Sequence, residues 1–506
     1  MGEYLLGIDI GTSACKAAVF NREGRVTAAA SREYRIYRVR PDWVEQDPEE
    51  WWHAACQAVK EIMMKSGIAA HDIAGIGVDG QSWTAVAVDG RGQVMTNTPI
   101  WLDSRTADIC RELNEKIGAD RIFSLSGNSL QPFYSTAKIL WYERNMPDVY
   151  KRTDKILQSN SYIAYRLTGQ ISQDLSQAYG LHCFDMKKGV WDMGMCRELG
   201  IREGLLPELF PCHQVIGTVS ARGARESGLC EGIPVVAGGL DAACGTLGAG
   251  VIHSGETQEQ GGQAGGMSIC TDCYKADPRL ILSYHVVPGK WLLQGGTTGG
   301  GGVMNWLERE FADYEREEAK RYGRTTMDLM NDNAEPITPG SDGLIFLPYM
   351  AGERSPIWDP SAKGVYYGLD FGKTKGHFIH AAMEGVAFSL KHNLDVAEEA
   401  GAKVAVLKAM GGSANSLLWT QIKSDVTGKP IVVPSSDTAT TLGAVILAGV
   451  GIGMYRDFEE AVKLTVVNKR YHVPNEENRR VYDKNYHTYL KVYENLKELM
   501  DQKEGV

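Results

Sequence analysis

Residues 4–20, YLLGIDIGTSACKAAVF, decide the fold. Two apolar runs, Tyr4–Ile10 and Ala14–Phe20, are separated by the small residues Gly11-Thr12-Ser13. This pattern predicts two antiparallel strands joined by a tight turn, and residues 25–30 are predicted to add a third strand after a polar turn. The meander carries one acid, Asp9, at the end of its first strand.

A similar unit recurs about half a chain later. Residues 233–237, IPVVA, have the composition of a buried strand, and GGLD, which ends at Asp241, terminates it. A helix rich in glycine and alanine is predicted at residues 242–250, and a glycine-rich strand pair at 257–269. The repeat predicts two related halves that face a common cleft. We place the boundary near residues 246–256, which gives an N-terminal domain of residues 1–247 and a C-terminal domain of residues 248–506.

Length and composition are those of a two-domain globular protein. The chain has 506 residues, more than one ordinary hydrophobic core accommodates. Apolar residues make up 43% of the chain and charged residues 23%, and no apolar run is long enough to span a bilayer. The net charge of −10 includes no long basic block, which argues against a nucleic-acid surface. The net charge does not exclude phosphate-containing ligands, because backbone amides can bind them.

The N-terminus and the cysteines indicate a cytoplasmic protein. MGEYLLGIDIG lacks the basic start, the apolar core and the cleavage site of a secretory signal. The ten cysteines are scattered beside apolar neighbours, as reduced buried thiols are. Cys270 and Cys273 form a CxxC, but no second pair completes a zinc site. We interpret this CxxC as a coincidence at a strand end.

Two segments resemble nucleotide-binding motifs and are excluded. Residues 75–80, GIGVDG, match GxGxxG, but they lie at the end of a predicted strand, and no helix opens there to hold a pyrophosphate. Gly372-Lys373-Thr374 resembles the end of a P-loop, but Tyr367 stands where that motif requires its earlier glycine.

The turn after Asp9 has the composition of a phosphate-binding loop. Glycine lets the backbone approach a phosphate, and the hydroxyls and amides of Thr12 and Ser13 can point toward its oxygens. Asp9 is placed to hold Mg²⁺ through water, and Lys16 follows on the next strand. An ordinary hairpin turn would have the same composition. The turn resembles the first phosphate loop of the actin and hexokinase superfamily.

Two longer segments resemble the signatures of the FGGY carbohydrate kinases. The second signature fits GVYYGLDFGKTKGHFIHAAME, residues 364–384, at every position, and the first fits FYSTAKILWYERN, residues 133–145, with Tyr142 as the departure. Shorter blocks follow in family order: WVEQDP (43–48), WLDSR (101–105), GERSP (352–356) and KAMGGSAN (408–415). The sequence is identified as a member of this family. The resemblance implies an α/β fold of two actin-like, ribonuclease H-like ATPase domains, with mixed sheets flanked by helices and a central cleft.

The resemblance also implies an acceptor site. Asp241 matches the family's catalytic aspartate, and one carboxylate is sufficient to take the proton of a sugar hydroxyl; a helix N-cap would also explain an aspartate here. The residues that correspond to the family's sugar site are Gln81, Ser82, Trp83, Trp101, Asp103 and Arg105, together with Asp241. Carboxylate, guanidinium and indole groups suit a polyol. Each tryptophan is equally well explained as a core residue.

The nucleotide is expected mainly on the second domain. The residues implied for ATP are Gly11, Thr12, Ser13 and Lys16 of the first loop, and Gly262, Gln263, Gly300, Gly411, Gly412, Ser413 and Asn415 of later glycine-rich segments. ATP and Mg²⁺ are the implied cofactors, and a small sugar and ATP are the implied partners. Homodimers are common in the family, but no segment of this sequence identifies an interface.

Two departures from the family concern the substrates. The second phosphate loop, usually Gly-Thr-Ser-Gly or similar, is Gly262-Gln263-Ala264-Gly265 here, so an amide replaces a hydroxyl. The pair Ser82-Trp83 stands where xylulokinases usually have Met-His, which changes the sugar site. The overall pattern is most similar to xylulokinases, so we expect D-xylulose to be converted to its 5-phosphate. L-Fuculose, L-xylulose and gluconate are the alternatives, and a regulatory ATPase or sugar sensor on the same fold is a rival of another class.

Overall fold

A computed structural model describes residues 2–435 and 438–501. Its first half is built on a sheet with the strand order β14-β15-β6-β1-β2-β3. The strands are β1 (Tyr4–Ile10), β2 (Ala14–Phe20), β3 (Val26–Glu33), β6 (Ile73–Gly80), β14 (Val215–Thr218) and β15 (Pro234–Val236). β1 pairs antiparallel with β2 and parallel with β6, and the short β16 (Gly239–Leu240) also pairs with β6. The predicted meander is confirmed.

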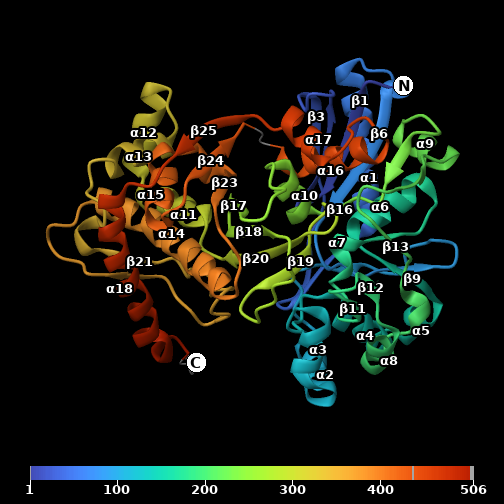
Figure 1. Ribbon diagram of the computed structural model, residues 1–506, viewed down its shortest axis with the longest axis horizontal. Coiled ribbons are helices and arrows are strands. Elements are labelled where there is room, and N and C mark those ends of the chain that lie inside the picture. Colours follow the sequence, from blue (N-terminus) through green and yellow to red (C-terminus); the bar gives the residue numbers. More distant parts are fainter. Residues whose placement is uncertain (1, 436–437, 502–506) are drawn as a thin grey trace.

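The second half repeats this arrangement. Its sheet has the order β19-β20-β18-β17-β23-β24-β25. The strands are β17 (Glu256–Gly261), β18 (Gly265–Thr271), β19 (Ile281–Tyr284), β20 (Trp291–Thr297), β23 (Val406–Met410), β24 (Ile431–Pro434) and β25 (Asn468–His472). β17, β18 and β20 form an antiparallel meander, and β17 pairs parallel with β23, as β1 does with β6. Figure 1 shows the two sheets in separate halves of the molecule. The predicted internal repeat and the fold class are therefore confirmed.

Long helices cover the sheets. α1 (Pro48–Ser66) packs on β2 and β3, and it begins as its sequence predicts, because Asp47 accepts a hydrogen bond from the Glu49 amide and Pro48 occupies the first turn. α14 (Lys375–Glu399) packs on β18 and β20 and carries the C-terminal part of the second signature. α18 (Glu476–Met500) lies along the outside of the second half (Figure 1).

Two helices join the halves. α10 (Asp241–Gly248) follows the first sheet, and α16 (Ala439–Gly451) belongs to the second half of the chain but packs on α10, β1 and β6. Glycines permit this approach: a Cβ on Gly77 would lie 1.9 Å from the Ala444 carbonyl oxygen, and one on Gly443 would lie 1.9 Å from the Cys244 carbonyl oxygen. The glycines of the excluded GxGxxG match therefore serve helix packing and not a dinucleotide.

Smaller elements complete the structure. The remaining helices are α2 (Ala107–Leu113), α3 (Ala119–Ser126), α4 (Ser135–Asn145), α5 (Pro147–Arg152), α6 (Ser159–Thr168), α7 (Leu175–Ala178), α8 (Met193–Leu199), α9 (Ala221–Ser227), α11 (Gly301–Phe311), α12 (Asp313–Tyr322), α13 (Thr326–Ala334), α15 (Leu417–Thr427) and α17 (Phe458–Thr465). The minor strands pair as β4 (Tyr37–Arg40), β5 (Trp43–Gln46) and β8 (Thr98–Pro99), β7 (Val86–Asp89) with β9 (Thr153–Leu157), β10 (Gln173–Asp174) with β13 (Leu209–Phe210), β11 (Phe184–Asp185) with β12 (Val190–Trp191), and β21 (Ile345–Leu347) with β22 (Val365–Tyr367).

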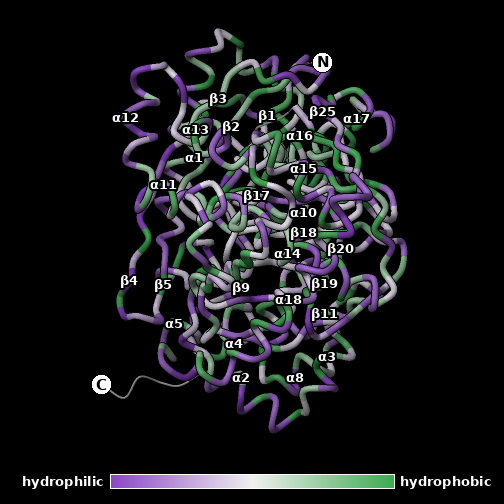
Figure 2. The backbone as a smooth tube through the Cα atoms, turned by 90° about the vertical axis from the view of Figure 1, so that its left-hand side faces the viewer, coloured by the Kyte–Doolittle hydropathy of each residue, from purple (hydrophilic) through white to green (hydrophobic). Residues whose placement is uncertain are grey.

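Polar residues lie on the outside of this arrangement. Figure 2 shows α12 at the periphery with a largely hydrophilic backbone trace. Cys270 is buried in β18, Cys273 is exposed, and both are free thiols, in agreement with the interpretation of this CxxC as a strand end. Among the residues described, no helix has the length and apolarity needed to cross a bilayer.

Candidate active site

Three acids gather where neighbouring strands of the first sheet end. Asp9 in β1 lies opposite Asp79 in β6, and Asp79 lies opposite Gly239 of β16, just before Asp241 opens α10. Because β1, β6 and β16 run parallel, their carboxyl ends meet at the same edge of the sheet. Ligands of α/β proteins commonly bind at such an edge.

Burial favours the protonated forms of these acids. Asp79 is fully buried, and neither of its carboxylate oxygens has a hydrogen-bond partner among the described residues. Burial and the charges of Asp9 and Asp241 raise the pKa of Asp79 well above its ordinary range. Burial also raises the pKa of Asp9, against the opposing charge of Lys16. Burial, with a contribution from Asp9, raises the pKa of Asp241 to about 7. Asp241 therefore changes protonation where a general base operates best.

Asp241 is accessible from the space between the halves. Its side chain is partly exposed, and the neighbouring residues Leu240 and Ala242 line a cavity. A carboxylate oxygen of Asp241 accepts a hydrogen bond from the Ala242 amide at 2.6 Å. Leu240, and not Asp241, occupies the N-cap position of α10. Capping therefore does not account for this aspartate.

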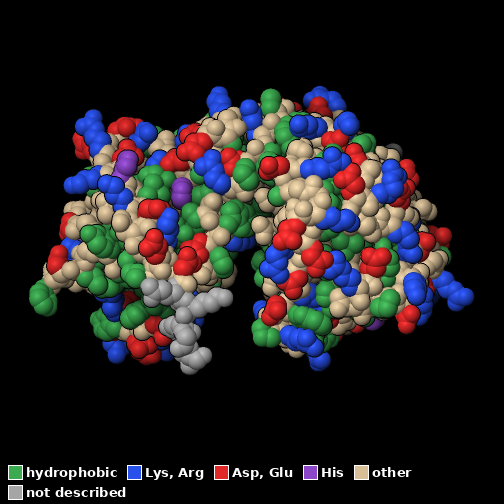
Figure 3. All heavy atoms as spheres, turned by 90° about the horizontal axis from the view of Figure 1, so that it is seen from below, with side chains coloured by type: hydrophobic (Ala, Val, Ile, Leu, Met, Phe, Trp, Pro, Cys, Tyr) green, Lys and Arg blue, Asp and Glu red, His purple; other side chains and the backbone are tan. Residues whose placement is uncertain are grey.

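The cavity beside Asp241 has a volume of about 170 Å³. The first half contributes Ser82 and Trp83 to its lining, and the second half contributes Arg354 and Trp358. Three further polar lining residues are Gln258, Gln260 and Gln294. Figure 3 shows the surface hollowed between the two halves. Amide, guanidinium and indole groups around a small space are suited to a polyol.

Trp83 and Trp358 line this cavity, and Phe133, which does not line it, stacks with both of them. The Phe133 ring lies between two others: its centroid is 4.9 Å from that of Trp83, with 30° between the planes, and 6.3 Å from that of Trp358, with 17° between the planes. We call Trp83, Phe133 and Trp358 the aromatic platform. The Nε1 of Trp83 is buried without a hydrogen-bond partner among the described residues, whereas the Nε1 of Trp358 donates to the Arg279 carbonyl. A flat apolar surface of this kind suits a sugar's carbon skeleton.

The first phosphate loop is connected to the sugar-site residues. Gly11, Thr12 and Ser13 join β1 to β2, and the Nε1 of Trp101 donates to the Thr12 hydroxyl at 2.8 Å. Gln46 donates to the Thr12 carbonyl at 2.8 Å and accepts from the Gln81 side chain at 2.7 Å. Trp101 and Gln81 are thus tied to the loop expected to bind phosphate.

Lys16 and Asp9 face each other across β1 and β2. They are paired in register, and both line a second cavity of about 310 Å³ that is closed on its other side by the start of α16. Oxygen ligands suit Mg²⁺, which keeps several waters and takes one or two carboxylates. One oxygen of Asp9 is buried without a partner in the described structure, so Asp9 fits such a role, with Asp79 beside it. Within residues 2–435 and 438–501, no set of three or more His, Cys, Asp or Glu side chains forms a preassembled metal site.

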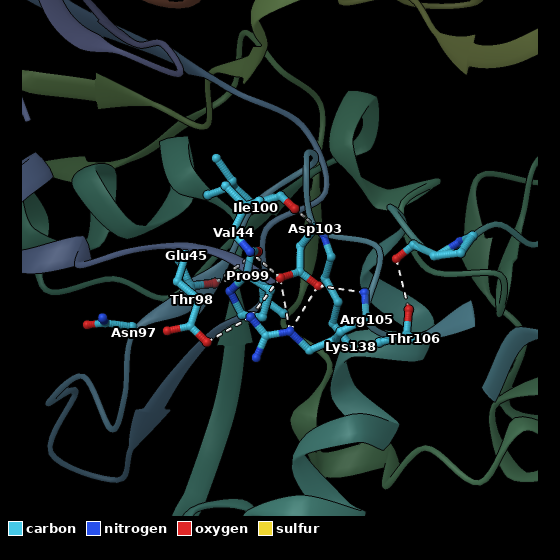
Figure 4. Close-up of polar contacts among 12 residues, drawn as sticks. Val44, Glu45, Asn97, Thr98, Pro99, Ile100, Asp103, Arg105, Thr106 and Lys138 are labelled. Atoms are coloured by element: carbon cyan, nitrogen blue, oxygen red, sulfur yellow. Dashed lines mark hydrogen bonds and ion pairs between the residues drawn. The ribbon is translucent and has the colours of Figure 1, made fainter. Parts of the chain in front are cut away.

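Asp103 and Arg105 differ from the expectation. Figure 4 shows their side chains directed at each other, and the Arg105 Nη2 lies 2.6 Å from Asp103 and 2.8 Å from Glu45. The guanidinium is also held between the rings of Trp43 and Trp141, at 4.1 and 4.7 Å from their centroids. Both side chains are almost fully buried, and neither lines the cavity beside Asp241. The charges of this pair are matched within the protein, but the Arg105 Nη1 is buried without a hydrogen-bond partner among the described residues, so a direct sugar contact stays a prediction.

The glycine-rich loops of the second half come together. Gly262 and Gln263 form the turn between β17 and β18, and their carbonyls accept hydrogen bonds from the Gly301 and Gly302 amides at 2.7 and 2.9 Å. A Cβ on Gly300 would lie 2.3 Å from the backbone of Ala264 in the same turn. The Gln263 side chain accepts from Asn305 at 3.2 Å, so it lies against α11.

The expected adenosine loop adjoins this turn. A Cβ on Gly411 would lie 2.8 Å from the Gly261 carbonyl oxygen, which brings the segment Gly412–Asn415 beside the second phosphate loop. The Ser413 hydroxyl is buried and accepts a hydrogen bond from Lys423 at 2.7 Å, and Lys423 also pairs with Glu259. Gly262, Gln263, Gly300, Gly411, Gly412, Ser413 and Asn415 therefore belong to one region.

Several residues of this site are absent from the sequence-based expectations. They are Gln46, Asp79, Arg354 and Trp358, together with Lys138, which does not line the cavity but donates to the Trp83 carbonyl. Asp79 lies within the excluded GxGxxG match. Its position at the end of a predicted strand, as for Asp9, is the signal that could have identified it as a site residue. Gln46, Lys138 and Arg354 lie in blocks that resemble the family, but nothing in the sequence shows that their side chains reach this region.

Comparisons with known proteins agree with this geometry. The model of the FGGY family of carbohydrate kinases matches residues 4–248 with its N-terminal domain and residues 270–452 with its C-terminal domain. The chain is 30% identical to the xylulose kinase of Bacillus subtilis over 98% of both chains, and 30% identical to the gluconokinase of the same species over 99% of this chain and 97% of that one. It superposes on the crystal structure of xylulose kinase from Rhodospirillum rubrum with a TM-score of 0.90, at 29% identity, over 99% of this chain and 100% of that one.

The family match and these relatives identify a carbohydrate kinase, and the two related α/β halves have the fold that the match implies. The chain belongs to the FGGY family of carbohydrate kinases.

Proposed function

We propose that this kinase transfers the γ-phosphate of ATP to D-xylulose and forms D-xylulose 5-phosphate. The observation that carries the proposal is the position of Asp241 between Leu240 and Ala242, which both line a small cavity with polar and aromatic side chains. Sugar kinases of this family use ATP. The likeness to xylulose kinases over nearly the full chain favours a pentulose as the acceptor.

In the proposed reaction, Asp241 takes the proton of the sugar hydroxyl. The oxygen then attacks the γ-phosphorus in line, the new O–P bond forms, and the bond to the bridging oxygen of ADP breaks. The first loop, with Thr12 and Lys16, and the turn at Gly262 would bind the phosphates from opposite sides of the cleft. Asp9 and Asp79 would hold Mg²⁺, which neutralises developing charge when it is bound.

Gluconate is the second candidate acceptor, because Arg354 places a cation in the lining of the cavity. A guanidinium binds a carboxylate through paired hydrogen bonds, and gluconokinases are as similar in sequence as several xylulose kinases. The pentulose has five carbons, with a hydroxymethyl group beside its ketone, whereas gluconate has six carbons and a carboxylate at that end.

The test is a coupled ADP-release assay across pentuloses, hexuloses and aldonates. We expect the highest kcat/KM with D-xylulose. A preference for gluconate of tenfold or more would replace the first candidate with the second. Equal ADP release with and without every sugar would refute the kinase assignment and favour an ATPase or a sensor.

A further inference from the structure

A buried lysine beneath the acceptor cavity has all its donors engaged with the backbone. Lys138 lies in α4 and is fully buried. Its ammonium donates to the carbonyl oxygens of Trp83 at 2.7 Å, Phe133 at 2.7 Å and Ile100 at 2.8 Å. An ammonium has three N–H donors and no acceptor. The contacts of Lys138 therefore use its full hydrogen-bonding capacity on three segments of the chain.

Each of these segments carries a group of the candidate active site. Trp83 and Phe133 are members of the aromatic platform. Ile100 directly precedes Trp101, whose indole donates to Thr12 of the first phosphate loop. Figure 4 shows Lys138 beside Ile100 and the Asp103–Arg105 pair. One side chain thus connects the acceptor cavity with the phosphate loop.

The backbone of Trp83 needs such a restraint. Its φ is 59°, in the left-handed region that bulky residues rarely adopt. The bond from Lys138 reaches the carbonyl of this same residue. The ring is enclosed by Tyr134 and Tyr179, at 4.6 and 5.9 Å between centroids, so a change in the backbone at this position would displace the ring from its packing.

Asp103 and Arg105 act on Lys138 in opposite directions, since the carboxylate favours its charged form and the guanidinium disfavours it. Burial lowers the pKa of Lys138 to about 7, and the nearby carboxylate of Asp103 opposes this shift. Asp103 therefore helps to keep the three-donor ammonium form.

We propose that Lys138 is a positioning residue for the acceptor site: by binding three backbone carbonyls, it holds Trp83 in the lining of the cavity, both directly and through the Phe133 ring that stacks on Trp83. The proposal rests on the proposed function in one respect, namely that the cavity beside Asp241 receives the acceptor. Lys138 itself does not line that cavity. Its effect is on the geometry of the aromatic platform, and displacement of such groups by about 1 Å can cost on the order of a hundredfold in rate.

The test compares Lys138→Met and Lys138→Arg with the control Lys155→Met. Methionine keeps most of the length of the side chain and removes its donors. Lys155 also donates to two backbone carbonyls, those of Gly204 at 2.7 Å and Leu206 at 3.3 Å, but these segments do not line the cavity. KM and kcat are measured for ATP and for the best acceptor in the panel, whichever sugar that is.

We expect Lys138→Met to lower kcat/KM for the acceptor about a hundredfold, with KM for ATP changed less than about threefold. Lys138→Arg should recover part of the loss, because its charge and donors are retained. Lys155→Met should leave the kinetic constants unchanged. An unchanged kcat/KM in Lys138→Met would overturn the proposal. Equal loss of nucleotide and acceptor binding in both Lys138 variants would also overturn it, because Lys138 would then support the whole fold.

Near-ultraviolet circular dichroism separates this proposal from the choice of acceptor. Lys138→Met should change the aromatic bands of the free protein, since Trp83 and Phe133 are in ring contact, and Lys155→Met should not. If the wild-type protein phosphorylates no sugar, the proposed function fails while the spectra still test Lys138. Identical spectra for wild type and Lys138→Met would contradict a positioning role.

Discussion

Lowering the pH from 7 to 5 should reduce kcat/KM for the acceptor about fiftyfold. Burial and the charge of Asp9 raise the pKa of Asp241 from 3.8 to about 7. The reactive carboxylate form would then be about half of the total at pH 7 and about 1% of it at pH 5. An aspartate with an unshifted pKa would stay ionised over this range, and kcat/KM would be nearly flat.

The assay should detect the sugar phosphate directly, because coupling enzymes have pH optima of their own. Initial rates at several acceptor concentrations and saturating ATP, from pH 5 to 8.5, give kcat/KM at each pH. We expect a slope near one in log kcat/KM below pH 7 and a plateau above it. A profile that is flat down to pH 5 would refute the assignment of a raised pKa to the catalytic base.

The same shift predicts the sign of a stability change. The folded state binds the Asp241 proton more tightly than the unfolded state does, so this residue favours folding most at low pH. Its contribution is lost as the pH rises from about 4 through about 7. The melting temperature of Asp241→Asn minus that of wild type should therefore be higher at pH 8 than at pH 5. A constant difference between the two proteins over that range would contradict the burial argument.

Three further substitutions test the supporting structure. Gly77→Ala places a Cβ 1.9 Å from the Ala444 carbonyl oxygen and should lower the free energy of unfolding by about 1–3 kcal/mol or more. Denaturant titration measures this change, and an unchanged midpoint would contradict the tight packing of α16 on β6. Trp101→Phe removes the donor to Thr12 and should raise KM for ATP roughly threefold to tenfold, as loss of about 0.5–1.5 kcal/mol implies, and a rise in the acceptor KM alone would argue against this link. Arg105→Met leaves Asp103 without its charge partner and should lower the free energy of unfolding by about 3–5 kcal/mol. A large rise in the acceptor KM without loss of stability would instead support the direct sugar contact that the sequence predicts.

The sequence predicts the fold well where local patterns repeat. Each meander is marked by apolar runs and a small-residue turn, and Asp241 stands out because it follows a strand and opens a helix. The position of α16 is not predicted in the same way. Nothing local in residues 439–451 indicates that this helix packs on β1 and β6 of the other half, since that contact depends on glycines more than 350 residues away in the chain.

The candidate site is predicted less completely, because side-chain partners depend on distant packing. Arg105 has the chemistry of a sugar ligand, but Trp43 and Trp141 enclose it and Asp103 neutralises it. Lys138 is part of a signature, yet its function depends on the directions of three carbonyl groups. Asp79 lies in the GxGxxG match, which is not a dinucleotide-binding site, and the motif itself gives no reason to expect an active-site acid there.

Sugar-dependent phosphoryl transfer by wild type and Asp241→Asn tests the catalytic assignment most directly. With D-xylulose and ATP, the wild-type protein should form ADP and a sugar phosphate in equal amounts. Asp241→Asn should lose this turnover, with ATP binding measured by calorimetry largely retained. Sugar-dependent turnover that persists in Asp241→Asn, together with unchanged ATP binding, would show that another group takes the proton.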